Sequence, residues 1–162
     1  MALKVLSNTI GAIRTIASSG PRFATFFVNT GCNRRCVYCV VPEQGSDTEL
    51  SPEIWGQITN RVTEWGVRLV SIIGGEPTLR KDLPEIVRHI SAKAVVSLTS
   101  NGDTLVGVEG GKRLKVLFES GISVLHLSLH DLGEVERQLD ILQLARKLGI
   151  VPILATVVTK AT

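Results

Sequence analysis

Cysteine is scarce in this 162-residue chain, which has three cysteines and none after Cys39. An odd number of thiols, in a chain large enough to build its own core, argues against a disulfide framework. Aromatic residues make up only 4% of the chain, and no apolar run is long enough to cross a membrane. Because 44% of the residues are hydrophobic and 20% charged, we expect one ordinary soluble domain. Since nothing in the sequence suggests a secreted protein, we expect a cytoplasmic location.

Acidic residues are absent before Glu43, whereas five basic residues lie in that stretch. After it, thirteen basic residues face fifteen acidic ones, so the net charge of +3 hides a basic N-terminal part. The residues alone allow either a solvated basic face or a docking face for an acidic partner. Nucleic-acid binding is not expected, because the basic residues are scattered and lack interleaved aromatic residues.

The first 19 residues are interrupted by polar side chains and make a poor signal-peptide core. Their apolar spacing instead predicts an amphipathic helix over residues 1–20, followed by a core domain over residues 21–162. The residues that form this apolar stripe are Leu3, Leu6, Ile10, Ile13 and Ala17.

Apolar, β-branched runs alternate regularly with helical patterns. Strands are predicted over residues 24–29, 67–73, 94–99, 123–129 and 151–158. Their nearly continuous apolar character is typical of parallel strands buried on both faces. Gly66, Gly121 and Gly149 each follow a helical pattern and precede a β-branched residue, which predicts left-handed helix caps. The chain is therefore α/β, with about five βα units joined by right-handed crossovers and with outer helices. Periodicity alone would fit a Rossmann sheet equally well, but no G-x-G-x-x-G follows the first strand.

Apolar spacing also predicts which side of each helix faces the core. A capping serine at Ser51 and a capping box beginning at Asp82 are expected to open the first two helices after the first strand. The predicted core-facing residues are Ile54, Ile58, Val62 and Trp65, then Leu83, Ile86, Val87 and Ile90, then Leu114, Leu117 and Phe118, and finally Val135, Leu139, Leu142 and Leu148.

All three cysteines lie in one short window, where Cys32, Cys36 and Cys39 have the spacing C-x3-C-x2-C. Three thiolates this close together can converge on one small metal centre. A structural zinc site or an ordinary iron-sulfur cluster takes four protein ligands, and the three histidines lie far from the window in sequence. The residues therefore predict a metal centre with one open position, with zinc binding or inert thiols as the alternatives.

The run Cys-Asn-Arg-Arg-Cys-Val-Tyr-Cys over residues 32–39 resembles the radical SAM superfamily. Gly74-Gly75-Glu76-Pro77 and Thr99-Ser100-Asn101-Gly102 add to the resemblance, which spans roughly residues 23–158. The resemblance implies an incomplete TIM barrel and a [4Fe-4S] cluster on Cys32, Cys36 and Cys39. It also implies that S-adenosylmethionine (SAM) binds the open iron and is cleaved to a 5′-deoxyadenosyl radical, which abstracts hydrogen from a substrate.

The same resemblance implies which residues contact SAM. The motif Gly74-Gly75-Glu76-Pro77 would hold the methionine amino group, although a strand-ending turn also explains these residues. Tyr38 would lie beside the adenine, Ser100 and Asn101 near the ribose and carboxylate, and Ser128 at another SAM-contacting position. His130, where many relatives carry an acidic residue, would touch the substrate or form a hydrogen bond in the barrel mouth.

Partners follow from the resemblance as well. It implies a small-molecule or peptide substrate and an acidic electron donor, such as a flavodoxin or ferredoxin, drawn to the basic residues between the cysteines. Many relatives continue to a sixth strand, whereas this sequence stops after the fifth. We therefore expect the edge at residues 153–158 to pair with another chain, or the sequence to be a fragment.

Two other interpretations remain open. Glycyl-radical activases share the cysteine spacing. A non-catalytic iron-sulfur or zinc-binding module, one that kept the cysteines but cannot turn over, would also explain a shortened barrel. The absence of cysteine after Cys39 argues against auxiliary clusters in this chain, and SAM binding would separate an enzyme from a non-catalytic module.

Overall fold

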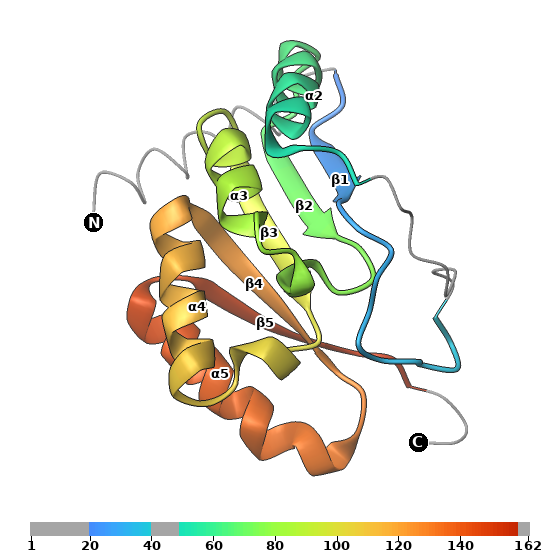
Figure 1. Ribbon diagram of the computed structural model, residues 1–162, viewed down its shortest axis with the longest axis vertical. Helices are drawn as coiled ribbons and strands as arrows, with labels where there is room; N and C mark the ends of the chain where they lie inside the picture. The colour runs from blue at the N-terminus through green and yellow to red at the C-terminus, as the bar shows by residue number, and fades with distance from the viewer. Residues whose placement is uncertain (1–19, 40–48, 159–162) are drawn as a thin grey trace.

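A computed structural model of the protein describes residues 20–39 and 49–158. Five parallel strands form one open sheet, and their order in space equals their order in the chain (Figure 1). The strands are β1 (Phe23–Phe27), β2 (Leu69–Ile73), β3 (Val95–Ser100), β4 (Ile122–Leu129) and β5 (Val151–Thr156). Each lies within a few residues of its predicted range, because buried β-branched runs specify strands locally.

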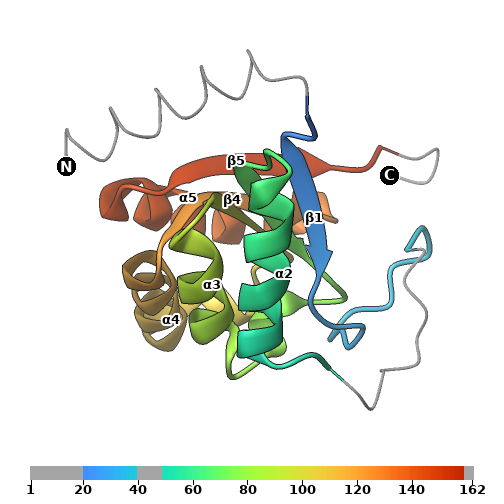
Figure 2. The same cartoon turned by 90° about the horizontal axis from the view of Figure 1, so that it is seen from above.

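Helices fill the crossovers between the strands. They are α2 (Pro52–Glu64), α3 (Leu83–Ser91), α4 (Gly107–Ser120) and α5 (Val135–Leu148), with short 3-10 turns η1 (Pro77–Leu79), η2 (Asp103–Leu105) and η3 (Leu132–Glu134). Figure 2 shows the helices packed against one face of the sheet. This arrangement is the predicted incomplete TIM barrel, in which sequential right-handed crossovers place every helix on the outer side.

The hydrophobic core lies between the sheet and the helices. Alternate strand residues point to this side, and Ile72, Leu98 and Leu127 have no exposed surface there. The opposite face carries small polar side chains such as Ser71 and Ser97, whose hydroxyls are 3.2 Å apart and hydrogen-bonded. One face of the sheet therefore builds the core, and the other does not continue it.

The predicted glycine caps are confirmed. Gly66, Gly121 and Gly149 have φ angles of 111°, 117° and 93°, in the left-handed region that favours glycine. Each of these residues ends a helix and turns the chain back toward the next strand.

The predicted inner face of α2 is partly wrong. Ile54 and Trp65 are 40% and 67% exposed, whereas Trp55 and Thr59 are buried. Trp55 stacks on Phe26 of β1 with ring centroids 5.0 Å apart. Burying this large aromatic ring turns the helix away from the aliphatic stripe that its spacing predicts.

The other local errors involve polar residues. In α5, Leu139 is 40% exposed while the polar Gln138 is fully buried. The side chains of Ser51 and Asp82 cap neither helix. Asp82 instead accepts hydrogen bonds from Arg80 at 2.6 and 2.8 Å, since a charged partner offers a stronger bond than a backbone amide.

Strand β5 departs from the prediction of burial on both faces. Among the described strands it pairs only with β4, and Val151, Ile153 and Leu154 are 56%, 38% and 41% exposed. An edge strand has a neighbour on one side only, so its side chains are less covered. Pairing of this edge with another chain stays a prediction.

Two further predictions concern the ends and the surroundings of the domain. The expected N-terminal helix falls on residues 1–19, which lie outside the described residues. Within the residues that are described, no helix combines the length and apolar character that a membrane span requires.

Candidate functional site

The predicted functional residues meet at one end of the sheet. Parallel strands all point the same way, so the segments that follow β1, β2, β3 and β4 share one edge, here called the rim. A pocket that is open to solvent lies at the rim. It is lined by Cys32, Arg34, Cys36, Tyr38, Cys39, Ile73, Gly74, Gly75, Glu76, Thr99, Ser100, Asn101, Ser128 and His130. Of the predicted site residues, Pro77 alone does not line it and instead begins η1.

The cysteine loop, residues 31–39, presents three free thiols to this pocket. Cys32 and Cys39 are exposed and Cys36 is half-buried. Within the loop, the amide of Cys39 donates to the carbonyl of Cys36 at 3.0 Å, and the amide of Arg34 donates to Cys32 Sγ at 3.4 Å. The thiols are therefore accessible and lie in one short loop, as ligands of a common centre must.

The spacing of the sulfur atoms distinguishes between metal centres. Around a tetrahedral zinc ion, sulfur ligands lie about 3.8 Å apart, as follows from a bond length of about 2.3 Å. Among the described residues, the only group of three metal-ligating side chains whose ligand atoms all lie within 4.8 Å of one another is Glu53, Glu85 and His89, outside the pocket. In this arrangement at least one pair of thiols therefore lies farther apart than two sulfur ligands of one zinc ion.

Tyr38 and His130 pair across the pocket. The phenol of Tyr38 is hydrogen-bonded to His130 Nδ1, and the two rings stack with an interplanar angle of 16°. His130 Nδ1 also lies 3.6 Å from Cys36 Sγ. Burial lowers the pKa of His130 and, with the neighbouring Cys36, raises the pKa of Tyr38. In this structure His130 takes part in hydrogen bonding at the barrel mouth, one of its two predicted roles.

The two glycines after β2 let the chain approach itself closely. Gly75 donates from its amide to the carbonyl of Asn29 at 2.9 Å, and Glu76 donates to the carbonyl of Gly31 at 2.8 Å. A Cβ atom at Gly74 or Gly75 would overlap Asn29 or Gly31. Because Gly74 and Gly75 have no side chain, the start of the cysteine loop can pack directly against the backbone at the end of β2.

Glu76 joins the ends of β2 and β3. It is 1% exposed, and its Oε1 accepts from Thr78 N at 3.0 Å, Thr78 Oγ1 at 2.6 Å and Ser100 Oγ at 2.9 Å. Its Oε2 accepts from the amide of Asn101 at 2.7 Å. The carboxylate thus carries four hydrogen bonds within the protein, and only Oε2 keeps capacity for a further donor.

Gln138, which the sequence analysis did not select, joins the ends of β3 and β4. Its Nε2 donates to the carbonyls of Asn101 at 2.9 Å and Ser128 at 3.0 Å. The side chain of Asn101 is also engaged, because its Nδ2 donates to Asn33 at 2.8 Å and its Oδ1 accepts from Asp103 N at 3.0 Å. The only sequence signal for this bridge was the helical spacing of Gln138 with Ile141 and Ala145, the other buried residues of α5.

Arg80 fastens the other side of the rim. Its side chain is 4% exposed and donates to the carbonyl of Val28 at 2.6 Å and to that of Leu50 at 2.9 Å. Its hydrogen bonds to Asp82 raise the pKa of Arg80 and lower that of Asp82. Through these hydrogen bonds, the buried guanidinium group of Arg80 ties two segments, the one that follows β1 and the one that precedes α2, to the turn after β2.

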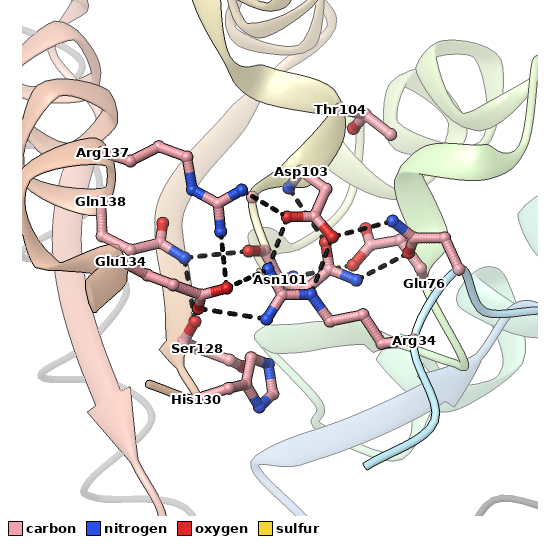
Figure 3. A network of polar contacts seen from close by, with 12 residues as sticks. Arg34, Glu76, Asn101, Asp103, Thr104, Ser128, His130, Glu134, Arg137 and Gln138 are labelled. Carbon is pink, nitrogen blue, oxygen red and sulfur yellow. Dashed lines mark hydrogen bonds and ion pairs between the residues drawn. The ribbon is translucent and has the colours of Figure 1, made fainter. Parts of the chain in front are cut away.

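Figure 3 shows a third group that the sequence analysis missed, in which Arg34, Asp103, Glu134 and Arg137 form ion pairs. Arg34 belongs to the cysteine loop, Asp103 to η2, Glu134 to η3 and Arg137 to α5. These residues are far apart in sequence, so no local pattern could have predicted their pairing.

Comparison with known proteins agrees with this geometry. Residues 26–159 match the Radical SAM superfamily. The chain is 41% identical over 107 residues to a probable GTP 3′,8-cyclase of Metallosphaera sedula, a match that covers 62% of this chain and 32% of that protein. It is 33% identical over 150 residues to the GTP 3′,8-cyclase of Listeria welshimeri, covering 81% of this chain and 43% of that protein. The chain thus spans a third to under half of the curated relatives it matches.

The fold resembles that of Streptococcus suis SuiB, whose crystal structure was determined with bound S-adenosylmethionine. The TM-score is 0.74 at 21% sequence identity, and the match covers 89% of this chain and 36% of SuiB. At that identity the similarity establishes the shared fold.

Proposed function

Because the chain belongs to the radical SAM superfamily, we propose that it cleaves SAM reductively at the cysteine loop. The superfamily uses a [4Fe-4S] cluster and SAM. When bound, a cluster with one open iron supplies the electron that splits SAM into methionine and a 5′-deoxyadenosyl radical. The observation that carries the proposal is the opening of all three thiols onto one pocket, which residues from the ends of β2, β3 and β4 complete.

In this proposal, Cys32, Cys36 and Cys39 bind the cluster and leave one iron for SAM. The thiols are free and all line one pocket, which supports the assignment. The number of protein ligands supports it too, because an ordinary cluster takes a fourth cysteine that this chain lacks.

The remaining pocket residues would bind SAM and shield it from water. We assign contacts to the bare backbone of Gly74 and Gly75, to the free position on Glu76 Oε2, and to Ser128. Ser100 and Asn101 would form a rigid wall, since hydrogen bonds within the protein already fix their side chains. A wall fixed in advance holds its ligand in one geometry at little entropic cost. Tyr38 would stack beside the adenine and Pro77 would support the turn.

The test is anaerobic reconstitution with iron and sulfide, followed by reduction with dithionite in the presence of SAM. Wild type should form 5′-deoxyadenosine, whereas Cys36→Ala should form none. Retention of zinc with no product would contradict the proposal. A cluster that binds SAM without cleaving it would favour the non-catalytic module instead.

A finer proposal concerns the substrate. The curated relatives are named GTP 3′,8-cyclases, and one of them is 33% identical over 81% of this chain. We propose that a purine nucleoside triphosphate, with GTP as the first candidate, is the hydrogen donor. Of the two carbons that such a cyclisation joins, the saturated 3′ carbon carries the weaker C–H bond, so hydrogen abstraction is expected there.

Deuterium transfer tests the substrate proposal. GTP that carries deuterium at the 3′ carbon should deliver it to 5′-deoxyadenosine, which mass spectrometry detects, while deuterated ATP serves as the matched control. Label transfer from neither nucleotide, with 5′-deoxyadenosine still formed, would retain SAM cleavage and reject GTP as the substrate of this chain.

An acidic electron donor remains part of the proposal. Arg34 is bound to two carboxylates, so the exposed Arg35 is the side chain of this loop that could meet a flavodoxin or ferredoxin. Replacement of Arg35 should slow reduction by such a protein while leaving reduction by dithionite unchanged. A glycyl-radical activase and a cytoplasmic location stay predictions.

A further inference from the structure

Arg34 lies at the centre of four charged side chains that join three separate segments of the rim (Figure 3). Its Nε donates to Asp103 Oδ2 at 2.7 Å and its Nη2 to Asp103 Oδ1 at 2.5 Å, which makes the pair bidentate. Its Nη1 donates to Glu134 Oε2 at 3.1 Å. Arg137 completes the set, 2.8 Å from Asp103 and 3.0 Å from Glu134. Two positive and two negative charges therefore balance.

The position of Arg34 in the sequence gives this network its significance. Arg34 lies between Cys32 and Cys36, and its own amide donates to Cys32 Sγ at 3.4 Å. The preceding residue is held to the same place, because Asn33 Nδ2 donates to Asp103 Oδ2 at 2.9 Å. The side chains of two consecutive residues between the thiols are thus anchored to η2.

The cysteine loop needs such an anchor. Within the described residues 32–39, one backbone hydrogen bond, from Cys39 to Cys36, holds the loop to itself. A segment with few backbone bonds opens easily unless its side chains are fixed. Gly31 holds the start of the loop, because its carbonyl accepts from Glu76 N, and the hydrogen bond of Tyr38 to His130 holds its end. Asn33 and Arg34 hold the part between Cys32 and Cys36.

The network is buried enough to be effective. The side chains of Arg34, Asp103 and Glu134 are 16%, 23% and 22% exposed, so solvent screens their attraction only in part. The hydrogen bond to Asp103 raises the pKa of Arg34, while Arg34 lowers the pKa values of Asp103 and Glu134. All these groups are therefore ionised at neutral pH. The exposed Arg35 next to them is not part of the network.

We infer that Arg34, Asp103 and Glu134 form a clamp that holds the cysteine loop over the pocket, with Arg34 as its central positioning residue. For the loop, the inference rests on the contacts above; for catalysis, it rests on the proposed cleavage of SAM. Because the clamp does not supply a thiolate, its loss removes none of the three cysteine ligands. It does let the cysteine loop move relative to the pocket residues that would bind SAM.

Hydrogen exchange on the full chain, reduced and free of metal, tests the clamp without any assay of activity. Exchange of the hydrogen-bonded amides in residues 31–39, such as that of Cys39, should become about tenfold faster in Arg34→Ala and in Asp103→Ala, since local opening governs their exchange. The increase in the double variant should be smaller than the product of the two single increases, because the two variants remove the same Arg34–Asp103 pair. Arg61→Ala, which removes an exposed ion pair in α2 instead, should leave this segment unchanged.

Reconstituted protein supplies the second measurement. Arg34→Ala should still take up iron and sulfide but should cleave SAM roughly 10- to 100-fold more slowly, the usual cost of a small misplacement. Arg34→Lys should recover only part of the rate, because lysine keeps the charge and loses the bidentate geometry. This variant also keeps the test decisive if the alanine variant folds poorly.

Three results would overturn the clamp. One is unchanged exchange of residues 31–39 in both single variants. Another is a double variant whose exchange increase is the product of the two single increases. The third is full SAM cleavage by reconstituted Arg34→Ala. If wild type itself fails to cleave SAM, the proposed function fails, and the exchange measurement still decides the clamp.

Discussion

The core beneath the sheet and the rim at its end are both buried, but different forces organise them. In the core, Ile72, Ile86 and Leu98 are fully buried hydrophobic residues. At the rim, Glu76 and Gln138 are as deeply buried, yet each is polar and bonded to two different loops. Apolar burial has no direction, whereas hydrogen bonds do. Hydrophobic burial in the core therefore drives the sheet and helices to assemble, and the hydrogen bonds at the rim determine where each loop lies.

This difference predicts that the two regions fail in different ways. A smaller side chain in the core should lower the free energy of unfolding and leave the chemistry of folded molecules intact. A changed side chain at the rim should alter loop geometry, and with it SAM cleavage, for a smaller loss of stability.

The largest loss of stability is expected for Ile86→Ala in α3. Ile86 has no exposed surface, so its truncation leaves a cavity and should cost about 2–5 kcal/mol of unfolding free energy. Urea denaturation measures this loss. SAM cleavage per folded molecule should stay at the wild-type rate. A lower rate would contradict the claim that core residues affect stability alone.

Gly75→Ala should break the rim. The added Cβ would overlap the backbone of Gly31, so the base of the cysteine loop must shift. We expect a loss of about 1–3 kcal/mol, typical of overpacking, together with a large drop in 5′-deoxyadenosine formation. Alanine at the exposed Gly107 is no suitable control, since its positive φ adds strain of its own. Gly31→Ala serves better, because a Cβ there meets nothing within 4 Å.

Gln138→Ala should sharpen the comparison, because it removes one bridge without adding volume. The carbonyls of Asn101 and Ser128 would each lose a buried donor, at a cost of about 1–2 kcal/mol. The exposed Gln143, on the same helix, is the matched control, and Gln143→Ala should change stability by no more than about 0.5 kcal/mol. Equal effects of the two substitutions on stability and SAM cleavage would contradict the bridge.

The smallest effect is expected from acid. Arg34 lowers the pKa values of Asp103 and Glu134 below their ordinary 3.8 and 4.5. A carboxyl group whose pKa is lower in the folded protein than in the unfolded chain stabilises the folded state at every pH above its unfolded-state pKa. This stabilisation is lost as the pH falls through the lowered, folded-state pKa. Asp103→Asn should therefore lower the free energy of unfolding by up to about 1 kcal/mol at pH 7. It should also make that free energy fall less steeply below pH 4 than it does in wild type. Unfolding curves at both pH values measure this, and parallel declines would exclude a role for Asp103.

The sequence predicted what local patterns encode. Apolar runs located the strands, and Gly66, Gly121 and Gly149 located the helix ends, because both depend on neighbouring residues. The parallel strands that the sequence predicts place the segments after them, and so the motifs, at one rim. The inner face of α2 was misjudged, since the stacking of Trp55 on Phe26 depends on a partner outside the helix.

The polar organisation of the rim could not be predicted in the same way. Arg34 and Asp103 are separated by 69 positions, and Gln138 and Asn101 by 37. Which polar side chain turns inward depends on a partner that only the fold brings near. The motifs identified the residues around the pocket, and the structure identified the charges and amides that hold those motifs together.

The central claim is that the rim presents an iron-sulfur cluster with one iron open to SAM. Electron paramagnetic resonance of the reconstituted, dithionite-reduced protein, recorded with and without SAM, tests it most directly. We predict the spectrum of a reduced [4Fe-4S] cluster whose g values shift when SAM is added. A spectrum that SAM leaves unchanged, or the absence of any cluster signal, would contradict the account.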